Sequence, residues 1–464
     1  MAGVCVVGAG YVGLATAVCL AELGHSVSCV EIEQRRLSLL RHGCAPIREP
    51  GLEEALKRLS RAARLRFTGS HTDALAGVSF TVLAVNTPAG SRGETDTSFV
   101  EDALRAIGNH IPRGSVLLLK STVPPGTGDA IAAKMAPRAV DVVSNPEFLR
   151  QGSALEDFMR PDRIVIGGDS EAAMRAVQRL YSGIRAPVYY CSRRSAEMAK
   201  YTANAFLAAR ISLINEVAGI CESTGADINE VSAIIGADRR IGPAFLGAGL
   251  GWGGSCLPKD LTALIDTASR YGRSHDMLEA VYRVNIGQRE LACRHLALAG
   301  VGREDPSVAV LGLAFKPNTG DIRGSPALEI IAHLLEDGFR VTAHDPAAID
   351  EAKSALPNIR YCSDAYSAAR GSDAVLLATE WETYRTLDWN RIRRLMRGNT
   401  IVDGRNLLDG SGLTEAGFNY VAFGKPVANR SKGDAERVRP IAEPVAAGGG
   451  SNGNSATRAT EKQR

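Results

Sequence analysis

The stretch Gly8-Ala9-Gly10-Tyr11-Val12-Gly13 decides the fold of the first part of this 464-residue chain. It follows the apolar run Val4–Val7 and precedes a helical pattern over Leu14–Leu23, which ends before Gly24. A G-x-G-x-x-G turn between a strand and a helix is typical of a dinucleotide-binding unit, because its glycines let the backbone approach a pyrophosphate. The free N–H groups at the helix N-terminus then hold the pyrophosphate charge. A glycine turn that binds nothing is the less favoured interpretation.

Further apolar runs alternate with helical patterns, which is typical of a doubly wound parallel sheet. In the first half of the chain these runs are Val4–Val7, Ser26–Val30, Phe80–Val85, Val116–Lys120, Val140–Val143 and Ile164–Ile166. In the second half they are Val308–Leu311, Arg340–Ala343, Ala374–Ala378 and Thr400–Val402. Between the two sets lies an all-helical block, with one long helix over Ser195–Thr224 that ends at Gly225. We therefore expect an α/β fold in which two Rossmann-like doubly wound parallel-sheet domains are joined by a long-helix all-α middle domain.

The expected domain boundaries follow from these changes of pattern. A dinucleotide-binding domain covers residues 1–195, a helical linker and dimerisation domain 196–300, a second nucleotide-binding domain 301–425, and a disordered tail 426–464. The tail is rich in Gly, Ala and Ser and contains almost no large apolar residue. A helix of about 30 residues spans about 45 Å, which exceeds the need of a small domain. It is therefore predicted to offer a face to a partner subunit.

Composition limits the class of protein. Hydrophobic residues make up 45% and charged residues 23% of the chain, with a net charge of +3. Such a small surplus gives no reason to expect a nucleic-acid or membrane surface. The start of the chain lacks a basic segment with a cleavage site, and no apolar run is expected to reach about 18 residues. The nine cysteines lie mostly singly in apolar runs, which favours reduced thiols and a cytoplasmic protein.

The acid after the second predicted strand indicates which dinucleotide binds. Glu31 lies 18 residues after Gly13, where a carboxylate accepts hydrogen bonds from the ribose 2′-OH. Arg36 follows one turn into the next helix and is the type of residue that accommodates a 2′-phosphate. Because Glu31 repels that phosphate, NAD is the expected cofactor rather than NADP.

The stretch Gly251-Trp252-Gly253-Gly254-Ser255-Cys256-Leu257-Pro258-Lys259-Asp260 indicates the chemistry. Proline favours the first turn of a helix, so Cys256 is predicted at a helix N-terminus. The helix dipole and Lys259 are expected to lower the pKa of the thiol and so favour the nucleophilic thiolate. Asp260 is placed to order a water or accept a proton beside the sulfur. A structural cysteine is the weaker alternative.

Other polar residues are candidates for the same site. Lys200 and Asn204 lie four apart in a small-residue stretch of the long helix and share one face. Spacing alone favours a solvated lysine, and the reactive cysteine is what makes an oxyanion-stabilising pair plausible. Glu147 and the hydroxyls of Ser121-Thr122 each follow a predicted strand, where ligands bind in open sheets. Either segment alone passes as an ordinary loop.

Taken together, these motifs resemble the UDP-glucose/GDP-mannose dehydrogenase family over about residues 1–420. The motifs are Gly8–Gly13, Ser121–Pro124, Asn145–Arg150, Lys200 with Asn204, Gly253–Asp260 and Leu311–Thr319. The resemblance implies an N-terminal NAD domain, a helical dimerisation block and a C-terminal domain that binds the UDP-sugar. It also implies a homodimer or higher homo-oligomer, and four-electron oxidation of UDP-glucose at C6 to UDP-glucuronate through a thiohemiacetal and a thioester on Cys256.

The resemblance also implies a role for each site residue. Cys256 is the nucleophile, Glu147 the acid/base for thioester hydrolysis, Lys200 and Asn204 the oxyanion stabilisers, Asp260 the water partner and Thr122 a water-holding hydroxyl. The implied cofactor contacts are Gly8, Gly10, Tyr11, Val12, Gly13, Glu31, Arg36, Thr87, Thr122, Lys259 and Arg323. The implied substrate contacts are Glu147, Phe148, Leu149, Arg150, Lys200, Asn204, Gly253, Cys256, Phe315, Lys316, Arg405 and Arg240, which reaches the site of a partner subunit. No metal is expected.

Some residues depart from the family pattern, and the sequence leaves other functions open. Gln151 stands where the family commonly has glutamate, and Gly320 and Gly324 replace positions that are usually acidic. One alternative is a GDP-mannose or other nucleotide-sugar dehydrogenase, and another is an NAD-binding module that has lost catalysis. A 3-hydroxyacid dehydrogenase also uses a lysine and an asparagine four apart on a long helix, but it needs neither Cys256 nor a second nucleotide-binding sheet.

Overall fold

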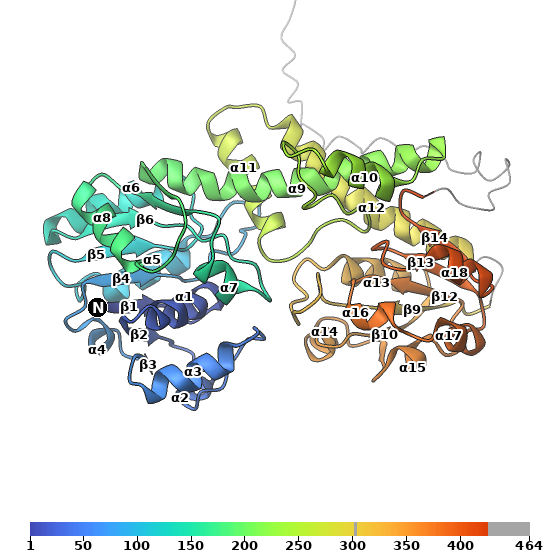
Figure 1. Ribbon diagram of the computed structural model, residues 1–464, viewed down its shortest axis with the longest axis horizontal. Coiled ribbons are helices and arrows are strands. Elements are labelled where there is room, and N and C mark those ends of the chain that lie inside the picture. The colour runs from blue at the N-terminus through green and yellow to red at the C-terminus, as the bar shows by residue number, and fades with distance from the viewer. Residues whose placement is uncertain (301–303, 426–464) are drawn as a thin grey trace, which may run out of the picture. The chain divides into compact units, whose positions relative to one another are not determined.

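A computed structural model describes residues 1–300 and 304–425, without the side chains of residues 299 and 300. The tail predicted over residues 426–464 lies outside the described residues. The described chain forms two sheets of mainly parallel strands, flanked by helices, and a helical block that connects them in sequence (Figure 1). The predicted fold class is confirmed.

The first sheet has eight strands in the order β3-β2-β1-β4-β5-β6-β7-β8. Neighbouring strands are parallel except β6 and β7, which pair antiparallel through Ser144 and Gly167. The strands are β1 (Gly3–Val7), β2 (Ser26–Val30), β3 (Leu65–Thr68), β4 (Phe80–Leu83), β5 (Val116–Leu119), β6 (Asp141–Ser144), β7 (Ile164–Gly167) and β8 (Val188–Cys191). The helices around them are α1 (Tyr11–Glu22), α2 (Gln34–Arg41), α3 (Leu52–Arg61), α4 (His71–Leu75), α5 (Ser98–Ile107), α6 (Thr127–Met135), η1 (Ala136–Arg138), α7 (Ala154–Met159) and α8 (Glu171–Leu180).

The second sheet has six strands in the order β11-β10-β9-β12-β13-β14, all parallel. The strands are β9 (Ser307–Leu311), β10 (Arg340–His344), β11 (Arg360–Tyr361), β12 (Ala374–Leu377), β13 (Thr400–Asp403) and β14 (Asn419–Ala422). The helices are α13 (Pro326–Glu336), α14 (Ile349–Ala355), α15 (Ala365–Ala369), α16 (Glu382–Arg385), α17 (Trp389–Leu395) and α18 (Gly410–Glu415). Fully buried strands such as β9 and β12 read as continuous apolar runs, because helices cover both faces of a parallel sheet.

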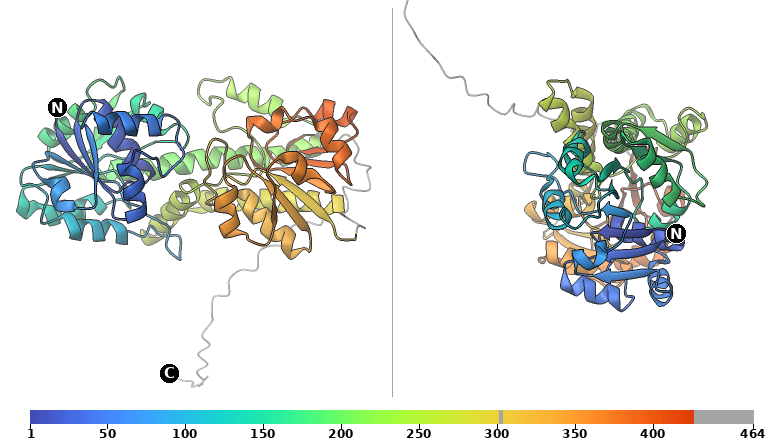
Figure 2. Two further views of the ribbon diagram at one scale, coloured as in Figure 1. Left: turned by 90° about the horizontal axis from the view of Figure 1, so that it is seen from below. Right: turned by 90° about the vertical axis from the view of Figure 1, so that its left-hand side faces the viewer.

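The helical block consists of α9 (Arg193–Thr224), α10 (Ile228–Gly236), α11 (Leu257–Arg270) and α12 (Asp276–Gly300). Helix α9 ends at Gly225, whose φ of 83° is left-handed and suits glycine. It packs on β6 and β7 near its start, and Glu222 near its end accepts a hydrogen bond from Gly424 N after β14. The helix therefore touches both sheet domains, as Figures 1 and 2 show.

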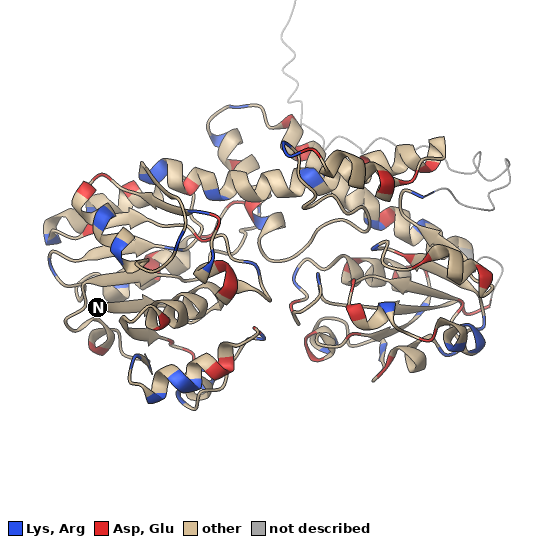
Figure 3. Ribbon diagram, in the orientation of Figure 1, with Lys and Arg blue, Asp and Glu red and all other residues tan. Residues whose placement is uncertain are grey.

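Helix α9 is the one helix in the described residues that has to be considered as a membrane span. By length and composition alone it is apolar enough to cross a membrane. However, its buried face carries Glu197, Lys200 and Asn204, and it packs against α11 and α12. A central helix of a folded core accounts for this composition. Acidic and basic residues are interspersed over the helices of both sheet domains (Figure 3).

The sequence pattern predicted the central strands and missed those at the edges. Every predicted strand is present to within two residues at either end, and the long helix begins two residues earlier than expected, at Arg193. The strands that were not predicted are β3, β8, β11 and β14, which lie at the sheet edges. β8 has two exposed tyrosines, and β11 has only two residues. Such short edge strands lack the buried apolar run that reveals a central strand.

Candidate active site

The glycine-rich turn between β1 and α1 is shaped to admit a dinucleotide. Gly8 has a φ of 97°, and a Cβ on Gly13 would lie 1.9 Å from the carbonyl oxygen of Gly8, so neither position accepts a side chain. A Cβ on Gly10 would meet only the Asn86 side chain, at 3.7 Å, which leaves that backbone open. No side chain caps the N-terminus of α1, which begins at Tyr11. Its N–H groups are therefore available to a pyrophosphate.

The carboxylate of Glu31 lies at the end of β2, as predicted. Its Oε1 accepts one hydrogen bond, from Glu33 N at 2.9 Å, and this leaves acceptor capacity for ribose hydroxyls. Arg36 donates to the Ala9 carbonyl at 2.8 Å and lies 3.7 Å from Glu31. A 2′-phosphate at this position would meet Glu31 and an arginine that is already engaged. The residues therefore fit NAD.

The Cys256 turn is held by backbone contacts that only glycine permits. A Cβ on Gly253 would lie 2.0 Å from Gly324 O, and one on Gly254 would lie 2.7 Å from the Phe315 ring. Gly324 itself has a φ of 57°, a left-handed conformation that suits glycine. Cys256 is the N-cap residue of α11 and is exposed. The predicted helix N-terminal position is confirmed.

The pKa of the Cys256 thiol differs from the prediction. Partial desolvation by the surrounding protein raises this pKa, the charge of Lys200 lowers it, and Glu147 and Asp260 raise it, so that the net shift is upward. The predicted depression by Lys259 is wrong, because the Lys259 ammonium is bonded to the Asp260 carboxylate beside it. Lys200, from a different helix, is the cation that favours the thiolate.

Lys200 and Glu147 form a buried ion pair next to the thiol. The Lys200 Nζ lies 3.1 Å from Glu147 Oε1, and both side chains are almost fully buried. Burial lowers the pKa of Lys200, but the charges of Glu147, Cys256 and Asp260 raise it by more, so this lysine remains a cation. Glu147 is oriented further by a hydrogen bond from Leu149 N. A fixed cation here can stabilise an oxyanion that forms beside the sulfur.

Asn204 and Asp260 form a second buried pair. The Asn204 amide donates to Asp260 Oδ2, and Lys259 donates to Oδ1 of the same carboxylate. Asp260 is 1% exposed and lies on α11, so these bonds join α9 to the helix that carries Cys256. Although the sequence spacing suggested only a shared face for Lys200 and Asn204, the structure shows that they contact two different carboxylates.

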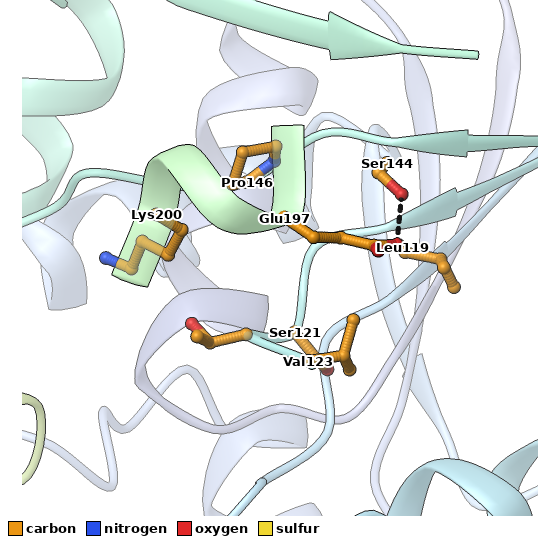
Figure 4. Close-up of a pocket in the computed structure, with 8 residues that line it drawn as sticks. Leu119, Ser121, Val123, Ser144, Pro146, Glu197 and Lys200 are labelled. Atoms are coloured by element: carbon orange, nitrogen blue, oxygen red, sulfur yellow. Dashed lines mark hydrogen bonds between the residues drawn. The ribbon is translucent and has the colours of Figure 1, made fainter. Parts of the chain in front are cut away.

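Two hollows adjoin these groups. A cleft of about 630 Å³ is lined by Glu147, Phe148, Leu149, Arg150, Lys200, Asn204 and Cys256, among others. A smaller cavity of about 10 Å³, lined by Thr122, Ser144, Glu197 and Lys200, has room for about one water. Figure 4 shows Glu197 and Lys200 on one helix, with Ser144 Oγ bonded to Glu197. This position suits the predicted water-holding role of Thr122.

The second sheet domain contributes cations to the region around the Cys256 turn, in addition to the Phe315 ring beside Gly254. Lys316 Nζ donates to the Gln151 carbonyl, and its pKa is lowered by burial first and then by Arg150. Arg405 donates to Gly251 O at 2.9 Å and so supports the glycine-rich turn. Arg323 donates to the Asp321 carboxylate, and its own backbone carbonyl accepts from Gly254 N.

Gln151 has a hydrogen-bond partner in the second sheet domain. Its amide nitrogen donates to Asp321 Oδ2 at 2.9 Å. A glutamate at this position would place two carboxylates in contact, so the amide suits its partner. Within the described chain, Gln151 Oε1 is a buried atom without a hydrogen-bond partner.

Three sequence-predicted residues are less directly involved. Thr87 is buried in the loop after β4, and no side-chain hydrogen bond places it at the cofactor turn. Arg240 is exposed and paired with Asp238. The structure does not test its predicted reach into a partner subunit. Val12 lies in the first turn of α1 and packs on the core beneath it.

Two buried carboxylates near the site were not found from the sequence. Glu197 accepts from Gly126 N, Gly128 N and Ser144 Oγ and thereby holds the start of α6. Glu49 accepts from Tyr11, Gly152 and Ala154. Both contacts join segments far apart in the chain, and no local motif marks either residue.

Comparison with known proteins identifies the family of this chain. Models of the UDP-glucose/GDP-mannose dehydrogenase family match the NAD binding domain over residues 2–185, the central domain over 194–286 and the UDP binding domain over 309–410. A UDP-glucose 6-dehydrogenase of Pseudomonas aeruginosa is 42% identical, and the match covers 93% of this chain and 99% of that protein.

Solved structures of related enzymes have the same fold. A UDP-glucose dehydrogenase from Pyrobaculum islandicum is 41% identical with a TM-score of 0.83, over 88% of this chain and 97% of that one. A UDP-D-ManNAc dehydrogenase from Pyrococcus horikoshii is 27% identical with a TM-score of 0.81, over 91% and 99%. The chain is therefore an NAD-dependent dehydrogenase and belongs to the UDP-glucose/GDP-mannose dehydrogenase family.

Proposed function

We propose that this enzyme oxidises the C6 alcohol of UDP-glucose to the carboxylate of UDP-glucuronate, through a thiohemiacetal and a thioester on Cys256. The observation that carries the proposal is the convergence of a thiol, a buried lysine and two carboxylates from separate segments around one cleft. Each of these groups has a role in an alcohol-to-acid oxidation that passes through a thioester. Overall, one alcohol, one water and two NAD⁺ give one carboxylate, two NADH and three protons.

The first half of the reaction makes and traps the aldehyde. NAD⁺ held at the α1 turn and Glu31 would supply the acceptor for the hydride that leaves C6 in each of the two oxidation steps. As the first hydride leaves, the C6 hydroxyl proton passes to a water or side chain in the cleft, and an aldehyde results. The Cys256 sulfur then adds to the carbonyl carbon, and the carbonyl electron pair moves to oxygen. Covalent attachment prevents the aldehyde from escaping before the second hydride leaves.

Lys200 and Asn204 stabilise the negative oxygen of the adduct. The charges of Glu147, Cys256 and Asp260 raise the pKa of Lys200, which favours its cationic form beside the thiol, and Asn204 donates to Asp260, which orients its amide. Donors that are fixed in advance lose little free energy to reorganisation during the reaction. When the second hydride leaves C6, the oxyanion becomes the carbonyl of a thioester.

Glu147 serves as the base for thioester hydrolysis. Its carboxylate is held by Lys200 and Leu149 N at the edge of the cleft that Cys256 lines. It removes a proton from an attacking water, the carbon–sulfur bond breaks, and the sulfur leaves as thiolate or thiol. Thr122 and the one-water cavity beside Lys200 supply a site for ordered water.

Sequence identity favours UDP-glucose over other nucleotide sugars. The two relatives named for UDP-glucose are 41–42% identical, whereas the structurally similar UDP-D-ManNAc dehydrogenase is 27% identical. The fold is common to all three, so the fold does not select the sugar. The free thiols of all nine cysteines also fit a cytoplasmic enzyme.

A panel of UDP- and GDP-sugars tests the proposal. UDP-glucose should give the highest kcat/KM, with two NADH formed per sugar and no free aldehyde. One NADH per sugar with release of aldehyde would contradict the covalent mechanism. Higher kcat/KM with GDP-mannose or a UDP-N-acetylhexosamine would contradict the proposed substrate while leaving the dehydrogenase chemistry in place.

We also propose that the enzyme is at least a homodimer built on α9. Phe206, Leu213 and Ile220 are 58–64% exposed and recur every seven residues, so they form one apolar stripe on this helix. Such a stripe fits a second copy of the same helix. Light scattering should show a dimer or larger oligomer, and Leu213→Glu should dissociate it. An active monomeric wild type would refute the interface and a cross-subunit role for Arg240.

A further inference from the structure

The carboxylate of Glu49 lies where two ligand-binding segments meet. Glu49 precedes α3, is 8% exposed and belongs to none of the sequence motifs. Its Oε2 accepts hydrogen bonds from the Tyr11 hydroxyl and from Gly152 N at 2.8 Å. Its Oε1 accepts from Ala154 N at 2.6 Å. A single buried carboxylate therefore satisfies three donors from two other segments.

Each donor has a functional place in the fold. Tyr11 is the first residue of α1, within the turn whose N–H groups receive the dinucleotide. Gly152 and Ala154 lie at the end of the loop that also carries Glu147, and Ala154 begins α7. The Tyr11 hydroxyl also lies 2.8 Å from Gly152 N. Burial and Glu49 both raise the pKa of Tyr11, so its phenol stays protonated and can donate.

The same loop reaches the second sheet domain through the residue before Gly152. The Gln151 carbonyl accepts from Lys316, and its amide donates to Asp321. The backbone of Gly152 also approaches Asn318, since a Cβ on this glycine would lie 3.1 Å from Asn318 O. A shift of Gly152 relative to Tyr11 would therefore move the contacts of Lys316.

We propose that Glu49 is a positioning residue that couples the two ligand sites, so that NAD at the α1 turn and the nucleotide sugar at Lys316 strengthen each other's binding. This inference rests on the proposed UDP-sugar substrate. The coupling path runs from Tyr11 through Glu49 to Gly152, and from Gln151 to Lys316. Glu49 lies outside both the α1 turn and the Lys316 loop, so its loss should change mutual binding more than the chemical steps on Cys256.

A carboxylate suits this position better than an amide. Glutamate presents two oxygens, which here face three donors, whereas glutamine presents one oxygen and an NH₂ group. In Glu49→Gln the NH₂ group must face either Ala154 N–H or the pair formed by Tyr11 and Gly152 N–H. The Tyr11 hydroxyl can turn to accept from the NH₂ group, but a backbone N–H cannot. In either orientation the amide therefore loses one backbone bond to the segment of Gly152 and Ala154, while the side-chain volume stays almost the same.

Calorimetric titration of the intact enzyme with UDP, in the presence and absence of saturating NADH, measures this coupling without turnover. We expect NADH to tighten UDP binding by about fivefold or more in the wild type, within the range of typical site–site coupling. In Glu49→Gln this ratio should fall below about twofold, with Lys316 and the α1 turn unchanged in sequence. Reciprocity requires the same loss when NADH is titrated with and without UDP.

Matched variants distinguish coupling from simple stability. Tyr11→Phe removes one donor but keeps the carboxylate, so it should lose part of the coupling, and the double variant should not lose more than Glu49→Gln alone. Glu53→Gln, which removes an exposed carboxylate paired with Lys57, and Tyr190→Phe should keep the wild-type ratio. If Glu49→Gln does not fold, Tyr11→Phe alone carries the test.

The outcomes separate this inference from the proposed function. A wild-type ratio near one, or an undiminished ratio in Glu49→Gln or Tyr11→Phe, would overturn the coupling role. A lower melting temperature with an undiminished ratio would assign Glu49 a structural role only. A wild type that binds NADH but not UDP would instead refute the proposed substrate, and the inference with it.

Discussion

The two sheets of this protein share six strands in one order and differ in what their turns can bind. β3-β2-β1-β4-β5-β6 and β11-β10-β9-β12-β13-β14 have the same arrangement. Each also begins its first crossover with a left-handed glycine, Gly8 with a φ of 97° and Gly312 with a φ of 100°. After this glycine the two paths separate. α1 begins at once, at Tyr11, whereas α13 begins only at Pro326, after a long loop that carries Phe315, Lys316 and Arg323.

The acid after the second strand shows the same divergence. Glu31 after β2 accepts one hydrogen bond through its side chain. Asp345 after β10 accepts five, from Leu313 N, Ala314 N, Ala347 N, Ala348 N and the Trp381 indole. A carboxylate that is already saturated has no acceptor left for a ribose. Equal topology therefore does not give equal ligands. The first sheet presents open N–H groups and a carboxylate with unused acceptor sites, and the second presents cations.

Replacing the thiol of Cys256, which lies between the two sheet domains in the chain, tests whether the reaction requires it. Cys256→Ser should lower kcat by roughly three orders of magnitude or more, because an alcohol is a far weaker nucleophile and leaving group than a thiolate. The Kd values of NADH and UDP, measured by calorimetry, should stay near those of the wild type, since the turns at Gly8 and Gly312 keep their sequence. Near-normal turnover to the acid would make Cys256 structural.

Replacing Glu31 and Asp345, the acids after β2 and β10, by the corresponding amides tests the difference between the two sheets. Asp345→Asn should destabilise the fold by about 3 kcal/mol or more, because buried N–H groups lose their acceptor. Glu31→Gln should barely change the melting temperature but weaken NAD binding by about ten- to a hundredfold, the value of a charge-assisted hydrogen bond. If Glu31→Gln lost stability and kept NAD affinity, the proposed division of roles would be reversed.

The sequence allowed prediction of features that arise from local patterns. The central strands, the α1 turn, the end of α9 at Gly225 and the N-cap position of Cys256 all follow from apolar runs, glycine and proline. The charges that set the thiol pKa could not be predicted in this way. Lys259 neighbours Cys256 in sequence but pairs with Asp260, while Lys200, far away in the chain, is the cation that lowers this pKa.

Residues that satisfy distant backbone donors were also missed for a physical reason. Glu49 and Glu197 each bond N–H groups of segments that meet only in the folded chain. Glu197 lies three residues before Lys200 on the buried face of α9, so the helical spacing indicates its burial but not the backbone donors that it bonds. Glu49 belongs to no periodic pattern. Arg240 was predicted from resemblance alone and stays a prediction, because its test requires a partner subunit.

The rate at which iodoacetamide alkylates Cys256 depends on the charges near the thiol. These are Glu147 in the first sheet domain and Lys200 on α9. The raised pKa means that the thiolate fraction at pH 7 is below the few per cent of an ordinary thiol, so the iodoacetamide rate should rise with pH beyond the usual thiol range. Lys200→Gln removes the favourable cation and should slow alkylation at a given pH by about tenfold. Glu147→Gln removes an opposing anion and should accelerate it. Equal rates in all three proteins would show that these charges do not act on the thiol.

The smallest expected effect concerns Lys316, the cation in the loop that replaces a glycine-rich helix start in the second sheet. Burial lowers its pKa, so in the free enzyme Lys316 loses its charge at a lower pH than an ordinary lysine. On the proposal that the UDP-sugar binds the charged form of Lys316, binding above that pKa takes up a proton, and the UDP Kd should rise by up to about tenfold per pH unit. Lys316→Arg keeps its charge throughout and should give a nearly flat profile over the same pH range.

NADH affinity should not follow this profile, because the α1 turn binds through backbone N–H groups that do not titrate. An identical pH dependence for UDP and NADH would show that a change common to both sheets, rather than the charge of Lys316, controls binding.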